Sequence, residues 1–176
     1  TYGFQPDIAS FAKGVTSGYI PLGGTVITDE VFDVMSEPDR MFMHGFTYSG
    51  HPVACATGLR NIRIVEEENL PANAAVQGDY LLDALHEGLD HHPHVGEVRG
   101  KGMMMIVEVV DDKGTKAKFD PSLNIGPRLQ AATRARGLIV RCSNDGIAIS
   151  PPLILTREEA SRVADAIQSA IVEVLG

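Results

Sequence analysis

The sequence predicts an α/β fold in two zones, residues 1–70 and 71–176. In the first zone, glycines interrupt apolar segments that are too short for helices, a pattern typical of strands joined by tight turns. In the second zone, a helical apolar stripe is followed by strand patterns and by another helical stripe at the C-terminus. With 44% hydrophobic residues, a chain of 176 residues buries one core, or one core and part of another.

The first zone is expected to contain two short strands and two helices. Short buried strands are predicted at residues 8–12 and 25–28. A short helix is predicted at 29–35, because two acidic residues in its first turn complement the helix dipole. A longer helix is predicted at 52–68, where apolar residues recur at three-residue steps.

The second zone is expected to open with a helix and a strand. The helix begins near Pro71, carries four leucines on one face and ends before Pro93. The strongly apolar segment 103–107 follows a glycine-containing turn and is predicted to be a strand. The polar segment 111–120 is expected to form a surface loop.

The C-terminal part of the chain is expected to form a helix, a strand pair and a final helix. The first helix is predicted at 125–136, where a glycine follows the last basic residues. Strands are predicted at 138–140 and 147–149, around a turn rich in Asn, Asp and Gly. Thr156 and Glu159 have the spacing of a capping box, which predicts a helix start there.

Charge and cysteine content exclude several kinds of partner and site. Fifteen Lys and Arg against 23 Asp and Glu give a net charge of −8, so we expect no nucleic acid partner. Cys55 and Cys142 stand far apart, which excludes a disulfide framework and favours a reducing, cytoplasmic location. No apolar run is long enough to cross a bilayer, so no membrane association is expected. The opening at Thr1, with no initiator Met, indicates a piece of a longer protein.

Lys13 is the first candidate for chemistry. It is the only lysine in the first hundred residues and directly follows the predicted strand at 8–12. A lysine at a buried strand end loses hydration, which favours the neutral amine and makes it a nucleophile for a carbonyl group. A lysine that merely extends from the strand end into solvent is the alternative interpretation.

Two further stretches offer groups that recognise anions. Residues 45–52 place hydroxyls and glycines just before a helix start, which suits a phosphate, although ordinary capping by Thr47 or Ser49 explains the same pattern. Arg141 follows apolar residues in a predicted strand, where its guanidinium requires a carboxylate partner. That carboxylate could belong to the protein or to a substrate.

The remaining histidines and cysteines do not predict a metal or nucleophilic site. The histidines at 86, 91, 92 and 94 have no spacing that completes a metal site, so we expect them on the solvated surface and expect no metal. His44 and His51 are interpreted as local hydrogen-bonding residues. Cys55 lies among alanines in a predicted helix and is interpreted as a core residue.

Taken together, these stretches resemble the class III, or omega-amino-acid, aminotransferases, which are fold type I enzymes that use pyridoxal 5'-phosphate. The stretches that match in order and spacing are residues 5–8, 12–24, 44–52, 137–141 and 150–156. The resemblance implies that residues 1–70 are the C-terminal part of a large pyridoxal phosphate-binding α/β domain. Residues 71–176 would then form the small α+β C-terminal domain.

The resemblance also implies roles for four residues. Lys13 would be the catalytic residue, joined to pyridoxal phosphate as a Schiff base, and would carry the proton during the reaction. Thr47 would contact the cofactor phosphate of a neighbouring subunit, and Phe46 would line that subunit's substrate pocket. Arg141 would bind the carboxylate of an amino acid or keto acid.

The implied reaction moves an amino group from an omega-amino acid, amine or diamine to a keto acid such as pyruvate. The implied assembly is a homodimer or higher homo-oligomer with the active site at the subunit interface. An aminomutase, racemase or decarboxylase on the same scaffold is the alternative, as is a fragment without activity of its own. The family's other cofactor-binding residues precede Lys13 and fall outside this chain.

Overall fold

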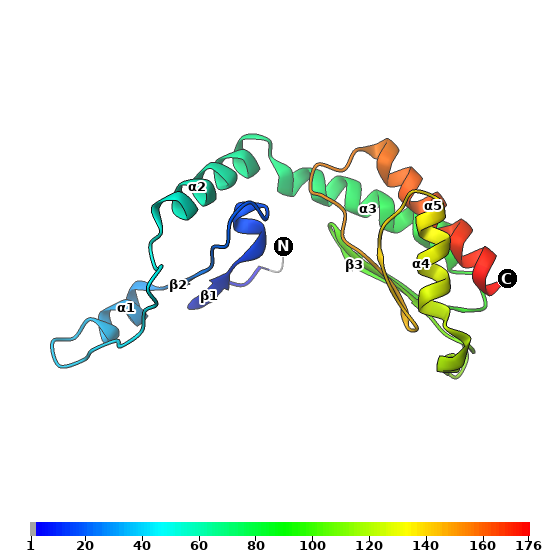
Figure 1. The fold of residues 1–176 in the computed structure, drawn as a ribbon, viewed down its shortest axis with the longest axis horizontal. Helices are drawn as coiled ribbons and strands as arrows, with labels where there is room; N and C mark the ends of the chain where they lie inside the picture. The colour runs from blue at the N-terminus through cyan, green and yellow to red at the C-terminus, as the bar shows by residue number, and fades with distance from the viewer. Residues whose placement is uncertain (1–2) are drawn as a thin grey trace. The chain divides into compact units, whose positions relative to one another are not determined.

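The structure is a computed structural model that describes residues 3–176; Thr1 and Tyr2, and with them the opening at Thr1, lie outside the described residues. The chain divides into two compact units, Thr1–Glu68 and Asn69–Gly176 (Figure 1). Each unit combines helices with an antiparallel sheet. Among the described residues, no helix is both long and apolar enough to cross a membrane.

The first unit is built around a two-stranded ribbon and one long helix. Its elements in chain order are β1 (Ile8–Phe11), the 3-10 turn η1 (Lys13–Thr16), β2 (Gly24–Ile27), α1 (Asp29–Met35) and α2 (Pro52–Glu67). Strands β1 and β2 pair antiparallel, with Ile8 opposite Ile27. Helix α2 packs on η1 through the face that carries Ala54 and Gly58, two buried residues one turn apart.

The second unit contains a four-stranded antiparallel sheet in the order β3-β4-β6-β5. Its elements are α3 (Leu70–Leu89), β3 (Val95–Lys101), β4 (Met104–Val109), η2 (Pro121–Leu123), α4 (Ile125–Ala135), β5 (Arg141–Ser143), β6 (Gly146–Ile149) and α5 (Arg157–Leu175). Alternation along the strands leaves one face apolar, where Met105, Val107 and Ile149 are buried. The same alternation places Glu97 and Arg99 away from the core, where their side chains pair at 2.7 Å.

The three helices of the second unit form one core with this sheet. Helix α5 packs against both α3 and α4, and α3 contacts β3 while α4 contacts β5 (Figure 1). The predicted leucine stripe of α3 lies in the core, with Leu81, Leu85 and Leu89 almost fully buried. The capping box of α5 is confirmed: the Thr156 hydroxyl accepts from the Glu159 N–H, and the Glu159 carboxylate accepts from the Thr156 N–H.

One strand differs from the sequence prediction. The strand expected at 138–140 instead lies at Arg141–Ser143, where Ser143 is opposite Gly146. A two-residue hairpin loop requires the strands to pair immediately on either side of it, so the strand adjoins the turn. Leu138 and Val140, which suggested the strand, pack against the hydrophobic core instead.

Candidate functional site

Lys13 begins a strained turn at the end of β1. Its φ is +54°, in the left-handed region that residues with a Cβ rarely adopt, and Ser17 and Gly18 are also left-handed, with φ of +49° and +78°. Thr16, only 1% exposed, stabilises the turn by donating its hydroxyl hydrogen to the Ile20 carbonyl at 2.6 Å. Gly18 adopts this conformation without strain, but Lys13 and Ser17 do not, and backbone strain of this kind is concentrated at functional sites.

The turn opens into a cleft of about 860 Å³ within the first unit. Lys13 lines this cleft, as do Phe46, Tyr48, Ser49 and His51 from the segment before α2. Its walls are mainly apolar with a few hydroxyl and ring-nitrogen groups, which is typical of a small-molecule site. The structure therefore brings Lys13 and Phe46 to the same cleft of one chain, whereas Thr47 is exposed and does not line it.

The expected burial of Lys13 is not found. Its side chain is exposed, and β1 is largely exposed as well, because β1 pairs only with β2 in the described part of the chain. These residues alone do not desolvate the amine. Lys13 instead lines the cleft with an exposed side chain, accessible to a small molecule.

The segment before α2 has a different cap from the one expected from its hydroxyls. His51 is the N-cap residue of α2, and its Nδ1 accepts a hydrogen bond from the Ala54 N–H at 3.5 Å. The interpretation of His51 as a local hydrogen-bonding residue is confirmed, and capping by Thr47 or Ser49 is wrong. Ser49 Oγ instead accepts from the Phe46 N–H at 3.3 Å, which closes the turn before the helix.

Arg141 belongs to the second unit, at the first position of the edge strand β5. Its side chain is exposed and lines a cleft of about 820 Å³ together with Arg136 and Arg162. Arg136 is paired with Glu173 at 2.7 Å, whereas no carboxylate in residues 3–176 lies within 4 Å of the Arg141 guanidinium. Arg141 therefore retains its full capacity to bind an external carboxylate.

Asn61 is a site residue that the sequence does not single out. Its side chain reaches from α2 to the Lys13 turn, where Nδ2 donates to the Gly14 and Val15 carbonyls at 3.0 and 3.1 Å. The sequence carries only a weak indication that Asn61 faces the Lys13 turn, because Asn61 follows the buried Ala54 and Gly58 at helical spacing. A polar residue in line with two buried small residues predicts a buried hydrogen bond, but not its partner.

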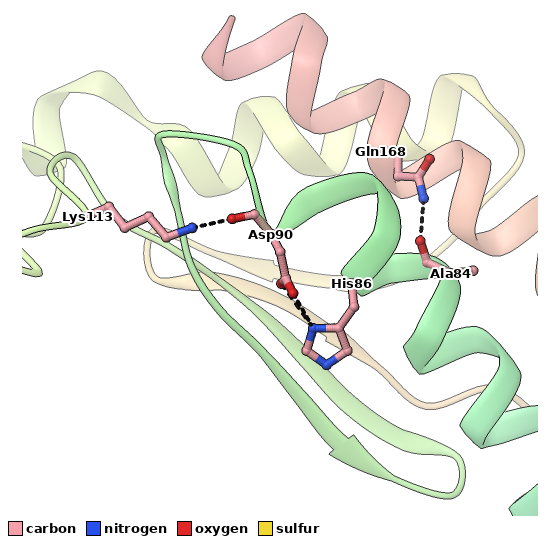
Figure 2. A network of polar contacts seen from close by, with 5 residues as sticks. All are labelled: Ala84, His86, Asp90, Lys113 and Gln168. Carbon is pink, nitrogen blue, oxygen red and sulfur yellow. Dashed lines mark hydrogen bonds and ion pairs between the residues drawn. The ribbon is translucent and has the colours of Figure 1, made fainter.

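The histidine cluster of the second unit is only partly on the surface. His86 Nδ1 lies 2.9 Å from the Asp90 carboxylate, and Lys113 donates to the Asp90 carbonyl at 2.6 Å (Figure 2). His92, expected to be exposed, is buried, and its Nδ1 accepts from the His94 N–H. Burial lowers the pKa of His92, and the neighbouring histidines and Lys113 lower it further.

The cysteines also differ in their surroundings. Cys55 is exposed on α2, so its interpretation as a core residue is wrong: helical neighbours that are small and apolar do not ensure that a position faces the core. Cys142 is half-buried in β5, and burial raises the pKa of its thiol. Within residues 3–176, no three or more His, Cys, Asp or Glu side chains gather where they could hold a metal ion.

Known proteins similar to this chain are transaminases. A diaminobutyrate–2-oxoglutarate transaminase of Halomonas elongata is 42% identical over 175 residues, which cover 97% of this chain and 37% of that protein. A putrescine–pyruvate aminotransferase of Pseudomonas aeruginosa is 43% identical over 154 residues, covering 88% of this chain and 33% of that protein. The chain thus spans little more than a third of these relatives.

Solved structures show the same similarity. An (S)-enantioselective omega-transaminase from Thermomicrobium roseum is 55% identical with a TM-score of 0.94, covering 99% of this chain and 39% of that one. An amine transaminase from an uncultivated Pseudomonas species, in a pyridoxal phosphate-bound form, is 43% identical with a TM-score of 0.91, covering 96% and 39%. These similarities confirm the predicted α/β class. The profile of the family described as aminotransferase class-III matches residues 1–171, and the chain belongs to that family.

Proposed function

We propose that this chain carries the lysine-bearing part of a pyridoxal phosphate-dependent transaminase. In this proposal, the first unit is the end of the large cofactor-binding domain and the second is the small C-terminal domain. The observation that carries it is the placement of Lys13 in a left-handed turn that opens into the 860 Å³ cleft. The names of the similar proteins, which are transaminases acting on diaminobutyrate and putrescine, favour amino transfer over the other reactions considered.

The residues of the cleft fit pyridoxal phosphate. Lys13 supplies the primary amine that holds an aldehyde covalently, and the apolar wall formed by Ile20, Pro21 and Leu22 suits a flat ring. When bound, pyridoxal phosphate supplies the electron sink that stabilises negative charge at the substrate carbon. The Lys13 amine, when free, would hold and move the proton taken from the substrate carbon.

The other predicted site residues act on substrate and assembly in this proposal. Arg141 binds the carboxylate of a keto acid or amino acid, since its guanidinium has no carboxylate partner among the described residues. Thr47 and Phe46 serve the neighbouring active site of a homodimer. The exposure of both side chains supports this role, although Phe46 also lines the Lys13 cleft of its own chain. Substrates are an omega-amino acid, amine or diamine and a keto acid such as pyruvate. We place the protein in the cytoplasm.

The proposal is tested by adding pyridoxal phosphate to the purified full chain and recording its visible absorption. A band is expected with the wild type and is expected to be lost in Lys13→Ala. Lys101→Ala is the matched control, because Lys101 is an exposed lysine of the second unit that pairs with Asp79. A chain that stays colourless with added pyridoxal phosphate would contradict cofactor binding by this chain. Sedimentation of the same samples tests the homodimer.

A further inference from the structure

Asn61 connects α2 to the turn that carries Lys13 through three hydrogen bonds. Its Nδ2 donates to the carbonyls of Gly14 and Val15, and its Oδ1 accepts from the Ser17 hydroxyl at 2.6 Å. These partners lie 44 to 47 positions earlier in the chain. One side chain therefore fixes three of the four residues that follow Lys13.

The three bonds determine the orientation of the Asn61 amide. The Ser17 hydroxyl donates to one end of it, and two carbonyls, which only accept, face the other end. Turning the amide over would place its oxygen against both carbonyl oxygens. The network is therefore satisfied in one orientation only, and a carboxylate of the same size would repel the Gly14 and Val15 carbonyls.

The turn requires such support because its backbone is unfavourable in isolation. Lys13 and Ser17 both have left-handed φ angles, and η1 is a single 3-10 turn of four residues. The hydrogen bonds within the turn, such as Ser17 N–H to the Gly14 carbonyl at 3.1 Å, tie its residues only to one another. Asn61 ties the turn to a helix of sixteen residues.

We propose that Asn61 is a positioning residue for Lys13: it holds the left-handed turn against α2 and so fixes the direction in which the lysine enters the cleft. This inference rests on the proposed function, in which Lys13 is joined to pyridoxal phosphate. Asn61 itself does not line the Lys13 cleft, so it acts through the backbone of the turn. Reactions of a positioned group are sensitive to misplacements of about 1 Å.

The test measures how fast Lys13 is joined to pyridoxal phosphate in the full chain. Apo protein is mixed with pyridoxal phosphate, quenched at intervals with borohydride, and the reduced adduct at each lysine is quantified by peptide mass spectrometry. Adduct formation at Lys13 is expected to slow by about ten- to hundred-fold in Asn61→Ala and in Asn61→Asp. The rate at Lys101, in the same samples, is expected to stay unchanged.

Asn73→Ala is the matched control for the loss of an asparagine. Asn73 also donates to two carbonyls, those of Leu153 and Leu155, but it lies in the second unit. The Asn73→Ala variant is expected to leave the rate of adduct formation at Lys13 unchanged. If Asn73→Ala slows adduct formation at Lys13 as much as Asn61→Ala does, the cause is a general loss of stability and the positioning role is overturned. A wild-type rate at Lys13 in both Asn61→Ala and Asn61→Asp would also overturn it.

Amide hydrogen exchange separates failure of this inference from failure of the proposed function. If Asn61 holds the turn, amides of residues 15–19 exchange faster in Asn61→Ala than in the wild type, while amides of α3 do not change. If the wild type forms no adduct at Lys13, the proposed function is contradicted, and exchange at residues 15–19 still decides whether Asn61 holds the turn. Unchanged exchange in Asn61→Ala would overturn the inference.

Discussion

Gly78 of α3 lies directly against the carbonyl of Gly102, in the turn between β3 and β4. A Cβ atom at position 78 would overlap the Gly102 backbone, which has a left-handed φ of +56°. The contact holds the β3–β4 hairpin against α3 at a distance that only glycine permits. The helix and the hairpin turn can separate only by breaking this packing.

Overpacking a core usually costs about 1–3 kcal/mol, and glycine to alanine in a helix gains at most about 1 kcal/mol. Gly78→Ala is therefore expected to lower the free energy of unfolding by a net amount of up to about 2 kcal/mol. Urea unfolding followed by circular dichroism measures the change. Gly114→Ala is the control, because a Cβ there would meet only Asp112 Oδ1 at 3.4 Å. Equal stability of the two variants would contradict the close packing.

Thr156→Ala is expected to destabilise the second unit by about 1 kcal/mol through loss of the α5 cap. The substitution removes the acceptor for the Glu159 N–H and one of the donors to the Glu159 carboxylate. Thermal unfolding measures the change. Thr156→Ser keeps the hydroxyl and should retain most of the stability; a loss as large as that of Thr156→Ala would show that the methyl group, not the hydrogen bond, matters.

Arg141→Ala is expected to raise the KM for a keto acid by about ten- to hundred-fold, since a charged hydrogen-bonded contact is lost. The KM for an amine donor without a carboxylate should not change. Steady-state kinetics with both kinds of substrate measure the split. Arg134→Ala removes an arginine of α4 that does not line this cleft and is the control. A similar rise for both substrates would contradict carboxylate recognition by Arg141.

As the pH is lowered below about 6.5, the free energy of unfolding is expected to decrease because of His92. The pKa of this histidine is lowered from 6.5 in the folded chain by burial, and then by His94, His91 and Lys113. The unfolded chain therefore binds a proton near pH 6.5 that the folded chain takes up only at lower pH. Proton uptake on unfolding makes the free energy of unfolding decrease as the pH falls through this range.

Urea unfolding at a series of pH values between 5 and 8 measures this dependence. His92→Asn removes the titrating ring and is expected to flatten the acid side of the profile, while its side-chain oxygen provides an acceptor near the His94 N–H. His91→Asn, at the exposed neighbour, removes only a minor cause of the lowered His92 pKa and should keep most of the wild-type slope, because burial, the largest cause, remains. If His91→Asn flattens the profile and His92→Asn does not, the buried ring is not the group responsible.

Much of the fold follows from local sequence signals. The helix at 29–35 and the capping box at Thr156 are found where the sequence predicts them, because both depend on residues within one turn. The apolar spacing of α3 likewise predicts the buried Leu81, Leu85 and Leu89, whereas Leu82 of the same predicted stripe is only partly buried. Strand β5 lies three residues beyond its predicted position, because apolar content alone does not show whether a residue pairs in a sheet or packs as a loop.

Some features of the candidate site also follow from the sequence, and others depend on packing. Residue type alone predicts the amine of Lys13 and the guanidinium of Arg141 as the groups that bring chemistry, and their roles stay predictions. Three features depend on packing between elements: the burial of His92, the exposure of Cys55, and the contact of Asn61 with a turn 47 positions away. They do not follow from the sequence pattern, because periodicity indicates the apolar face of one element, whereas burial and hydrogen-bond partners depend on which other element packs against it.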